Sequence, residues 1–152
     1  MKRIPWIESI SFALVLFLDQ LTKIIIAYTI PYGQSTPVIP GVVYFTTTHN
    51  TGTIWGIGQG GNLIFAGLAI VVVVLIVIFS PAIAKNTLAK IAIGAILGGA
   101  IGNNIIDRFS RGFVIDFIDF KFFPIFNVAD IGIVCGAITI GAIMLFSKEE
   151  RK

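Results

Sequence analysis

Four long apolar stretches constrain the fold of this chain more than any other feature of its sequence. Each is long enough to cross the hydrocarbon core of a bilayer, which takes about 20 residues of helix. Of the 152 residues, 56% are hydrophobic and only 12% are charged, which is too much apolar surface for a soluble core of this size. We therefore predict an all-α integral membrane protein, a single polytopic domain over residues 1–152. Its helices are expected from Trp6 to Tyr28, Asn62 to Ile83, Leu88 to Ile106, and Val128 to Phe146.

The two longer connections, at about 31–61 and 107–127, contain the segments suited to β-strands. Val38 to Asn50 is rich in β-branched and aromatic residues, which is typical of one or two short strands. Phe113 to Phe123 can contribute another extended piece. We predict that these segments form a small extracytoplasmic β platform above the helices.

The distribution of lysine and arginine predicts the orientation of the chain, because these residues concentrate in cytoplasmic connections. The connection 31–61 contains none, and basic residues flank the other ends of the helices, at Lys2, Arg3, Lys85, Lys90, Lys148, Arg151 and Lys152. Both termini are therefore expected in the cytoplasm. The connection 107–127 is an exception, since it holds basic residues beside aspartates, which indicates a constrained polar site.

Carboxylates are the side chains best suited to chemistry in this chain. A single cysteine, Cys135, and a single histidine, His49, exclude a disulfide, a CxxC motif and a multi-histidine metal site. We expect His49 to be a loop residue and not a general base. No basic patch with interleaved aromatic residues indicates a nucleic-acid partner. The remaining candidates are Asp19, Asp107, Asp116, Asp119 and Asp130.

Asp130 lies three residues into the last apolar stretch. A carboxylate inside a membrane helix costs about 2.5–3.5 kcal/mol on insertion scales, so it usually marks a functional site. Two neighbouring carboxylates share one proton near neutral pH, an arrangement that can hydrolyse a peptide bond without a covalent intermediate. Two alternatives remain open. Asp130 can simply cap its helix while Asp116 and Asp119 are solvated, or Asp19 and Asp130 can form the relay of a small proton-coupled transporter.

Four sequence blocks resemble the motifs of one family. They are DQLTK from Asp19, NTG from Asn50, GGAIGNNIIDR from Gly98, and VIDFID with FNVAD from Val114 to Asp130. These blocks are similar, in content and in order, to those of the lipoprotein signal peptidases (signal peptidase II, the A8-type aspartic peptidases). The resemblance covers essentially the whole chain.

The resemblance implies a membrane aspartic endopeptidase that removes the signal peptide from diacylglyceryl-modified prolipoproteins, before the lipidated cysteine. It implies Asp116 and Asp130 as the catalytic pair and no metal or cofactor. The implied substrate-binding residues are Asn50, Gly52, Asn104, Arg108 and Asn127, with Asp19 and Lys23 in support as an intrahelical pair. Asp107 and Asp119 are assigned to structural roles.

The resemblance further implies membrane lipids and globomycin-type inhibitors as ligands, and a multi-pass place in the bacterial inner membrane with the site near the outer leaflet. One departure concerns the third block, which has one residue more between its Gly-Asn pair and Asp107 than the family motif. Asn104 is preferred for the pocket because its spacing to Arg108 fits the motif, and Asn103 remains an alternative. After Gly52, Thr53 and Ile54 replace the usual alanines, which affects the expected shape of the pocket.

Overall fold

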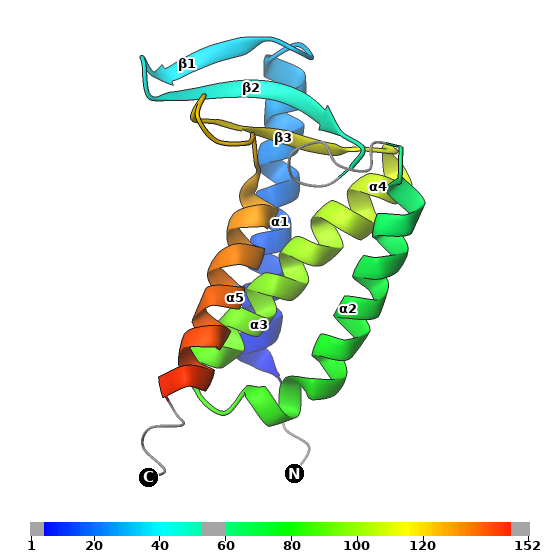
Figure 1. Ribbon diagram of the computed structural model, residues 1–152, viewed down its shortest axis with the longest axis vertical. Helices are drawn as coiled ribbons and strands as arrows, with labels where there is room; N and C mark the ends of the chain where they lie inside the picture. The colour runs from blue at the N-terminus through cyan, green and yellow to red at the C-terminus, as the bar shows by residue number, and fades with distance from the viewer. Residues whose placement is uncertain (1–4, 53–59, 147–152) are drawn as a thin grey trace.

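Four helices stand side by side and a small sheet covers one of their ends (Figure 1). The computed structural model describes residues 5–52 and 60–146. In chain order the elements are α1 (Trp6–Thr29), β1 (Ser35–Ile39), β2 (Val43–Asn50), α2 (Asn62–Ile83), α3 (Thr87–Ala100), the π-helix η2 (Ile101–Asp107), α4 (Arg108–Ser110), β3 (Val114–Asp119) and α5 (Val128–Phe146). This arrangement confirms the predicted class of four membrane helices with a small β platform.

Helix α3 is the centre of the bundle, and it makes its most extensive contacts with α1 and α5. Small residues allow these backbones to approach closely. A Cβ added to Gly94 would lie against the backbone oxygen of Glu8 and 2.7 Å from Cβ of Ser11, both in α1. One added to Gly99 would lie against the backbone oxygen of Ala129 in α5. Glycine is therefore needed at these two positions of α3 for α1 and α5 to pack closely against it.

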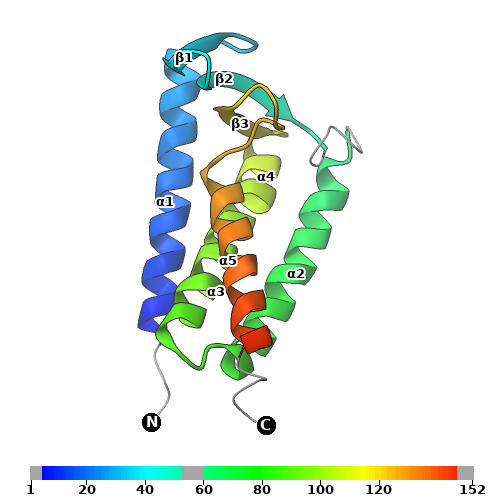
Figure 2. The same ribbon diagram turned by 60° about the vertical axis from the view of Figure 1, so that its left-hand side comes forward.

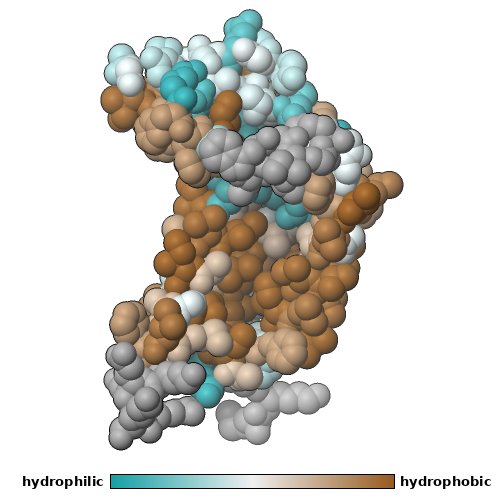
Figure 3. All heavy atoms as spheres, viewed as in Figure 1, coloured by the Kyte–Doolittle hydropathy of each residue, from teal (hydrophilic) through white to brown (hydrophobic). Residues whose placement is uncertain are grey.

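Helix α2 stands apart from α1 and α5 and packs mainly against α3, η2 and α4 (Figures 1 and 2). Most of its large hydrophobic side chains are exposed. Its surface matches the apolar band that the other helices present, whereas the sheet is largely hydrophilic (Figure 3). The apolar band is suited to lipid, and the sheet to the water beyond it.

The sheet is antiparallel with strand order β1-β2-β3. Strand β3 is buried along nearly its whole length, because β2 pairs with it and it lies over the ends of the helices. Phe117 of β3 packs with Ile26 and Ile30 at the end of α1, which joins the sheet to the bundle. The pairing of β2 with β3 continues to Asn50, opposite Val114.

His49 lies within β2, so its predicted position in a loop is wrong. The segment Val38 to Asn50, predicted to be extended, does include His49, and its last residues pair with β3. The imidazole ring stacks on Phe113, with 3.7 Å between ring centroids, and lies 4.4 Å from the ring of Tyr32. Partial burial lowers the pKa of His49, which suits a neutral ring packed among aromatic side chains.

The third membrane helix extends from Thr87 to Ser110, four residues beyond its predicted end at Ile106. Its continuation includes the π-helix η2, which coincides with the segment that has one residue more than the family motif. A π-helical turn accommodates one inserted residue within an α-helix. The helix can therefore keep both the glycines of α3 and the polar residues after η2 in place.

Candidate active site

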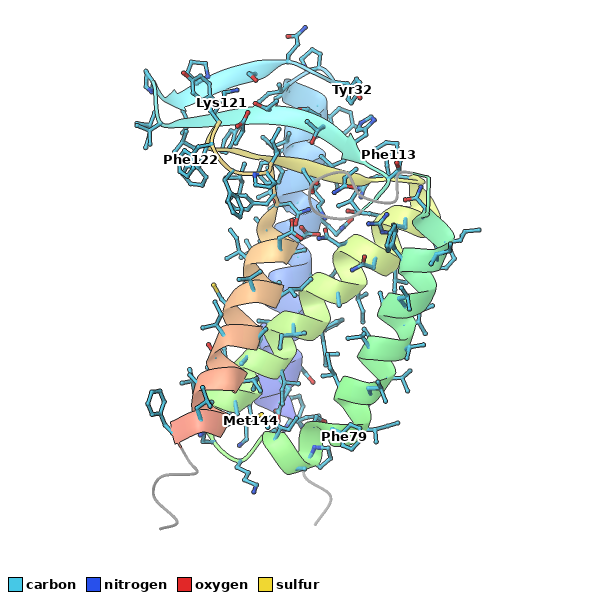
Figure 4. All side chains as sticks on the ribbon, viewed as in Figure 1. Tyr32, Phe79, Phe113, Lys121, Phe122 and Met144 are labelled. Atoms are coloured by element: carbon cyan, nitrogen blue, oxygen red, sulfur yellow. The ribbon has the colours of Figure 1, made fainter. Side chains whose placement is uncertain are left out.

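Polar side chains gather between the sheet and the adjacent ends of the helices, whereas the side chains farther along the helices are almost entirely hydrocarbon (Figure 4). The two predicted catalytic aspartates lie in this polar layer. Asp116 is a buried residue of β3, opposite Thr48 of β2. Asp130 is in the first turn of α5. The strand and the helix thus each bring one carboxylate to the same layer.

Asn127 connects the two aspartates. Its backbone N–H donates to Oδ2 of Asp130 at 3.0 Å, and its Oδ1 accepts from the backbone N–H of Asp130 at 3.0 Å. This reciprocal pair is a capping box, which satisfies free N–H groups at the start of α5. The Nδ2 group of Asn127 donates to Oδ1 of Asp116 at 2.7 Å and to the carbonyl of Ile115 at 3.3 Å.

The side chain of Asn127 is fully buried, and both its oxygen and its amide nitrogen are engaged by these groups. The sequence predicted a substrate contact for this residue. The structure brings it between the aspartates, where it fixes their relative position. Asp130 does cap its helix, as one alternative in the sequence analysis supposed. The same carboxylate also belongs to the candidate catalytic pair, so the two roles do not exclude each other.

Asn50 bonds the second oxygen of Asp116. It is the last residue of β2, and its Nδ2 donates to Oδ2 of Asp116 at 3.0 Å. Its Oδ1 accepts from the backbone N–H of Gly52 at 2.9 Å. Because that N–H can only donate, the orientation of the Asn50 amide is fixed with its nitrogen toward Asp116.

Arg108 holds together the segments beside the aspartates. Its guanidinium donates to the carbonyl of Gly52 at 2.6 Å, to Oδ1 of Asn62 at 2.7 Å and to Oδ1 of Asn104 at 3.3 Å. The guanidinium carbon also lies 5.3 Å from the ring centroid of Phe65. Asn62 is a site residue that sequence reasoning missed, since an asparagine at the start of an apolar helix carries no specific signal. Thr53 and Ile54 lie outside the described residues.

A buried polar cluster lies on the helix side of the aspartates. Lys23 is fully buried, and its Nζ donates to Oδ2 of Asp19 at 2.7 Å, Oδ2 of Asp107 at 2.6 Å and Oδ1 of Asn103 at 2.5 Å. The expected pair of Asp19 and Lys23 is present. Asp107 of η2, which the sequence analysis assigned to a structural role, is also fully buried and forms a second ion pair with Lys23. Asp19 also accepts from the backbone N–H of Ala129 at 3.0 Å, next to Asp130.

Asn103, and not Asn104, reaches the aspartates. Its Nδ2 donates to Oδ1 of Asp130 at 2.8 Å. Asn104 contacts Arg108 instead, four residues along the helix. The sequence offered both residues, and the π-helical geometry of η2 decides which of them faces α5.

Asp119 lies away from this layer, although it is only three residues from Asp116. Residues three apart in a strand point to opposite faces of the sheet. Asp119 accepts from Thr46 at 2.6 Å and from Nζ of Lys121 at 2.7 Å. Partial burial acts to raise the pKa of Asp119, but the hydrogen bonds from Lys121 and Thr46 bring it below its usual value. Asp119 is thus a stable anion in a structural ion pair.

The electrostatics of Asp116 differ from those of Asp119. Burial, together with the negative charge of Asp130, raises the pKa of Asp116 to about 7, against the opposing hydrogen bonds from Asn50 and Asn127. Asp116 can therefore hold a proton near neutral pH, as acid catalysis requires. Among residues 5–52 and 60–146, no group of three or more His, Cys, Asp or Glu side chains is arranged to hold a metal ion.

Comparisons with known proteins identify the family of this chain. A family model described as signal peptidase (SPase) II matches residues 11–146. A lipoprotein signal peptidase from Caldanaerobacter subterraneus is 46% identical, covering 88% of this chain and 92% of that protein. One from Staphylococcus carnosus is 41% identical, covering 97% and 98%. A solved bacterial membrane enzyme structure superimposes with a TM-score of 0.89 at 36% identity, covering 95% of this chain and 91% of that one. This chain belongs to the signal peptidase II family.

Proposed function

We propose that this protein is a membrane aspartic endopeptidase that removes the signal peptide from diacylglyceryl-modified prolipoproteins, cutting before the lipidated cysteine. Membership of the signal peptidase II family supports a peptidase and not the alternative of a proton-coupled transporter. The observation that carries the aspartic mechanism is the position of Asn127, which bonds the carboxylates of both Asp116 and Asp130. Two carboxylates held together by one buried amide are suited to sharing a single proton.

The reaction needs one aspartate as an acid and the other as a base. The ionised carboxylate takes a proton from a water molecule, whose oxygen attacks the carbonyl carbon of the scissile peptide bond. The protonated carboxyl group gives its proton to the carbonyl oxygen, so a neutral tetrahedral intermediate forms. When the carbon–nitrogen bond breaks, the leaving nitrogen takes the proton that the base removed from water, and a hydroxyl group of the intermediate returns a proton to the other carboxylate. No covalent bond to the protein forms at any step.

The site's place at one end of the bundle suits a substrate anchored in lipid. The bias of basic residues favours cytoplasmic termini, which would put the sheet and both aspartates near the outer leaflet. A diacylated cysteine would then approach sideways from that leaflet, because moving acyl chains through water costs about 0.8 kcal/mol per exposed methylene. The separation of α2 from α1 and α5 supports a lateral route.

The test replaces each aspartate by its amide and measures cleavage of a lipidated prolipoprotein by gel shift. Asp116→Asn and Asp130→Asn should each reduce kcat by at least about 100-fold, the usual contribution of general acid–base catalysis. The matched control is Asp119→Asn, which should lose far less, because its partners Thr46 and Lys121 lie on the other face of the sheet. Near-normal activity of either dyad variant would remove that residue from the mechanism.

The substrate class is tested separately with the wild-type enzyme. An unlipidated precursor with the same cleavage sequence should be a poor substrate compared with the lipidated form. Equal turnover of the two would show that peptide alone is recognised. The proposed lipid specificity would then be wrong even if both aspartates were required.

A further inference from the structure

Lys23 is connected to Asp130 through a single side chain, that of Asn103. The ammonium group of Lys23 lies 2.5 Å from Oδ1 of Asn103, and Nδ2 of Asn103 lies 2.8 Å from Oδ1 of Asp130. Lysine has three N–H donors and no acceptor, so the Asn103 atom facing it must be the oxygen. The other end of the amide, its NH₂ group, must then face Asp130.

We propose that Lys23 determines which of the two aspartates carries the shared proton: by fixing the amide of Asn103, it keeps Asp130 as the ionised base and leaves the proton on Asp116. This inference rests on the proposed aspartic mechanism and adds to it the separate roles of the two carboxyl groups. Lys23 and Asn103 are positioning residues in this scheme.

The hydrogen-bond donors of the two carboxylates differ in whether a neighbouring charge polarises them. Asp130 accepts from Asn103, whose oxygen is itself bonded to the Lys23 cation, and from the backbone N–H of Asn127, which cannot rotate. A hydrogen bond strengthens when its donor is polarised by a neighbouring charge. Within the part of the chain that the structure describes, the carboxylate of Asp116 accepts from the neutral side-chain amides of Asn50 and Asn127. The negative form is therefore favoured on Asp130.

Charge balance in the buried layer supports the same assignment. The charged groups around Asp130 are Asp19 and Lys23 of α1, Asp107 of η2, Arg108 of α4, Arg111 after it, and Asp116 of β3, while α2 has no charged residue between Asn62 and Ile83. Among residues 5–52 and 60–146, three cations thus face four carboxylates in this layer, so the layer is neutral when one proton is bound.

The proton belongs to the pair formed by Asp116 and Asp130, because the other two carboxylates have direct cationic partners. Asp19 pairs with Lys23, and Asp107 pairs with both Lys23 and Arg111. Buried carboxylates stay charged when they are paired and become protonated when they are not. Burial and the negative charge of Asp130 raise the pKa of Asp116 to about 7, so this carboxyl group can hold the proton near neutral pH.

The experiment measures the pH dependence of kcat and KM for Lys23→Met and Asn103→Leu, with lipidated prolipoprotein as substrate. Each should lower kcat about 10- to 100-fold with little change in KM. The acid-side half-activity pH should rise by about one unit, the effect expected from losing one hydrogen bond to a charged group. Lys121→Met removes a lysine outside the layer and should leave the profile unchanged. In a double variant that stays folded, Lys23→Met should add no further change to the acid-side half-activity pH of Asn103→Leu, because Lys23 acts on that pH through Asn103.

A purely structural role would lower activity without moving the pH profile, and that result would overturn the inference. Lys23→Met leaves Asp19 and Asp107 without their shared cation, so it can fail to fold. Asn103→Leu keeps both ion pairs and then decides the question alone. Asp116→Asn and Asp130→Asn, measured in the same assay, distinguish a failure of this inference from a failure of the proposed aspartic mechanism. If both abolish cleavage while Asn103→Leu keeps the wild-type profile, the mechanism stands and the inference falls; if neither does, the mechanism falls.

Discussion

Asp116 combines burial with a neighbouring negative charge, which together raise its pKa from 3.8 to about 7. As the acid of the proposed mechanism, Asp116 is active only when protonated, which is the state below that pKa. We predict that kcat/KM falls as pH rises through about 7, with the alkaline limb governed by this group. The measurement is cleavage of lipidated prolipoprotein across the pH range. Activity that stays level far into the alkaline range would show that Asp116 does not act as an acid.

Individual site residues were predictable from the sequence only where their chemistry was already specific. Asp130 stood out because a carboxylate inside a membrane helix is costly, whereas Asp116 was singled out as its partner by the family resemblance. The role of Asn127 was not predictable, because a capping box and a pocket-lining amide use the same residue types at the same spacing. Asn62 and the contact of Asn103 with Lys23 depend on packing between distant segments, which spacing along the chain does not reveal.

At the scale of the element, η2 explains how the helix tolerates its additional residue. We predict that deletion of Asn104 converts η2 into ordinary α-helix and keeps Asn103 and Asp107 on Lys23. The variant should stay folded and keep cleavage within about 10-fold of wild type, since the π-turn absorbs a single residue. Thermal unfolding in detergent and the gel-shift assay check both parts.

The control deletes Ile96, which lies in the regular α-helical part of α3. There a deletion rotates every later residue by about 100° around the axis, which moves Asn103, Asp107 and Arg108 away from their partners. That variant should be inactive. If the two deletions were equally damaging, the π-helix would not be the site of the accommodated residue.

The contact between α3 and α1 leads to a second prediction at this scale. Gly94→Ala should lower the thermal midpoint in detergent, because the added Cβ meets the rigid backbone of α1 at Glu8. Gly67→Ala in α2 is the matched control, since nothing lies within 4 Å of its added Cβ. It should be neutral or slightly stabilising, as alanine is favoured over glycine in helices by about 1 kcal/mol. An unchanged midpoint for Gly94→Ala would mean that α1 and α3 can separate without cost.

Most helix ends followed from hydropathy, because the ends of an apolar run are sharp in the sequence. The end of the third membrane helix did not, since its last turns are polar. They remain helical because Lys23 and Arg111 pair with Asp107 inside the protein. The sheet was foreseeable from β-branched and aromatic composition, whereas the pairing of β2 with β3 at His49 and Asn50 was not, because it joins segments that lie far apart in the sequence.

At the scale of the whole molecule, α1 begins and α5 ends on the side opposite the sheet (Figure 1). We predict that this side is cytoplasmic, in line with the bias of basic residues. A probe cysteine at Ser35 in the exposed strand β1 should react with a membrane-impermeant thiol reagent added from outside, and one at Asn86 before α3 should not. Both probes are made in a Cys135→Ser background. The reverse pattern of labelling would invert the topology.

The N–H groups that bond the oxygens of Asp116 and Asp130 come from Asn50, Asn103 and Asn127, which are spread over about half of the chain. During synthesis these asparagines leave the ribosome one after another, and the last belongs to the start of the final helix. A partly inserted chain therefore has no matched pair of aspartates, however well its earlier helices are placed. The proposed catalytic pair therefore forms only when the final helix is in place, because Asp130 and the amide that connects it to Asp116 both lie at its start.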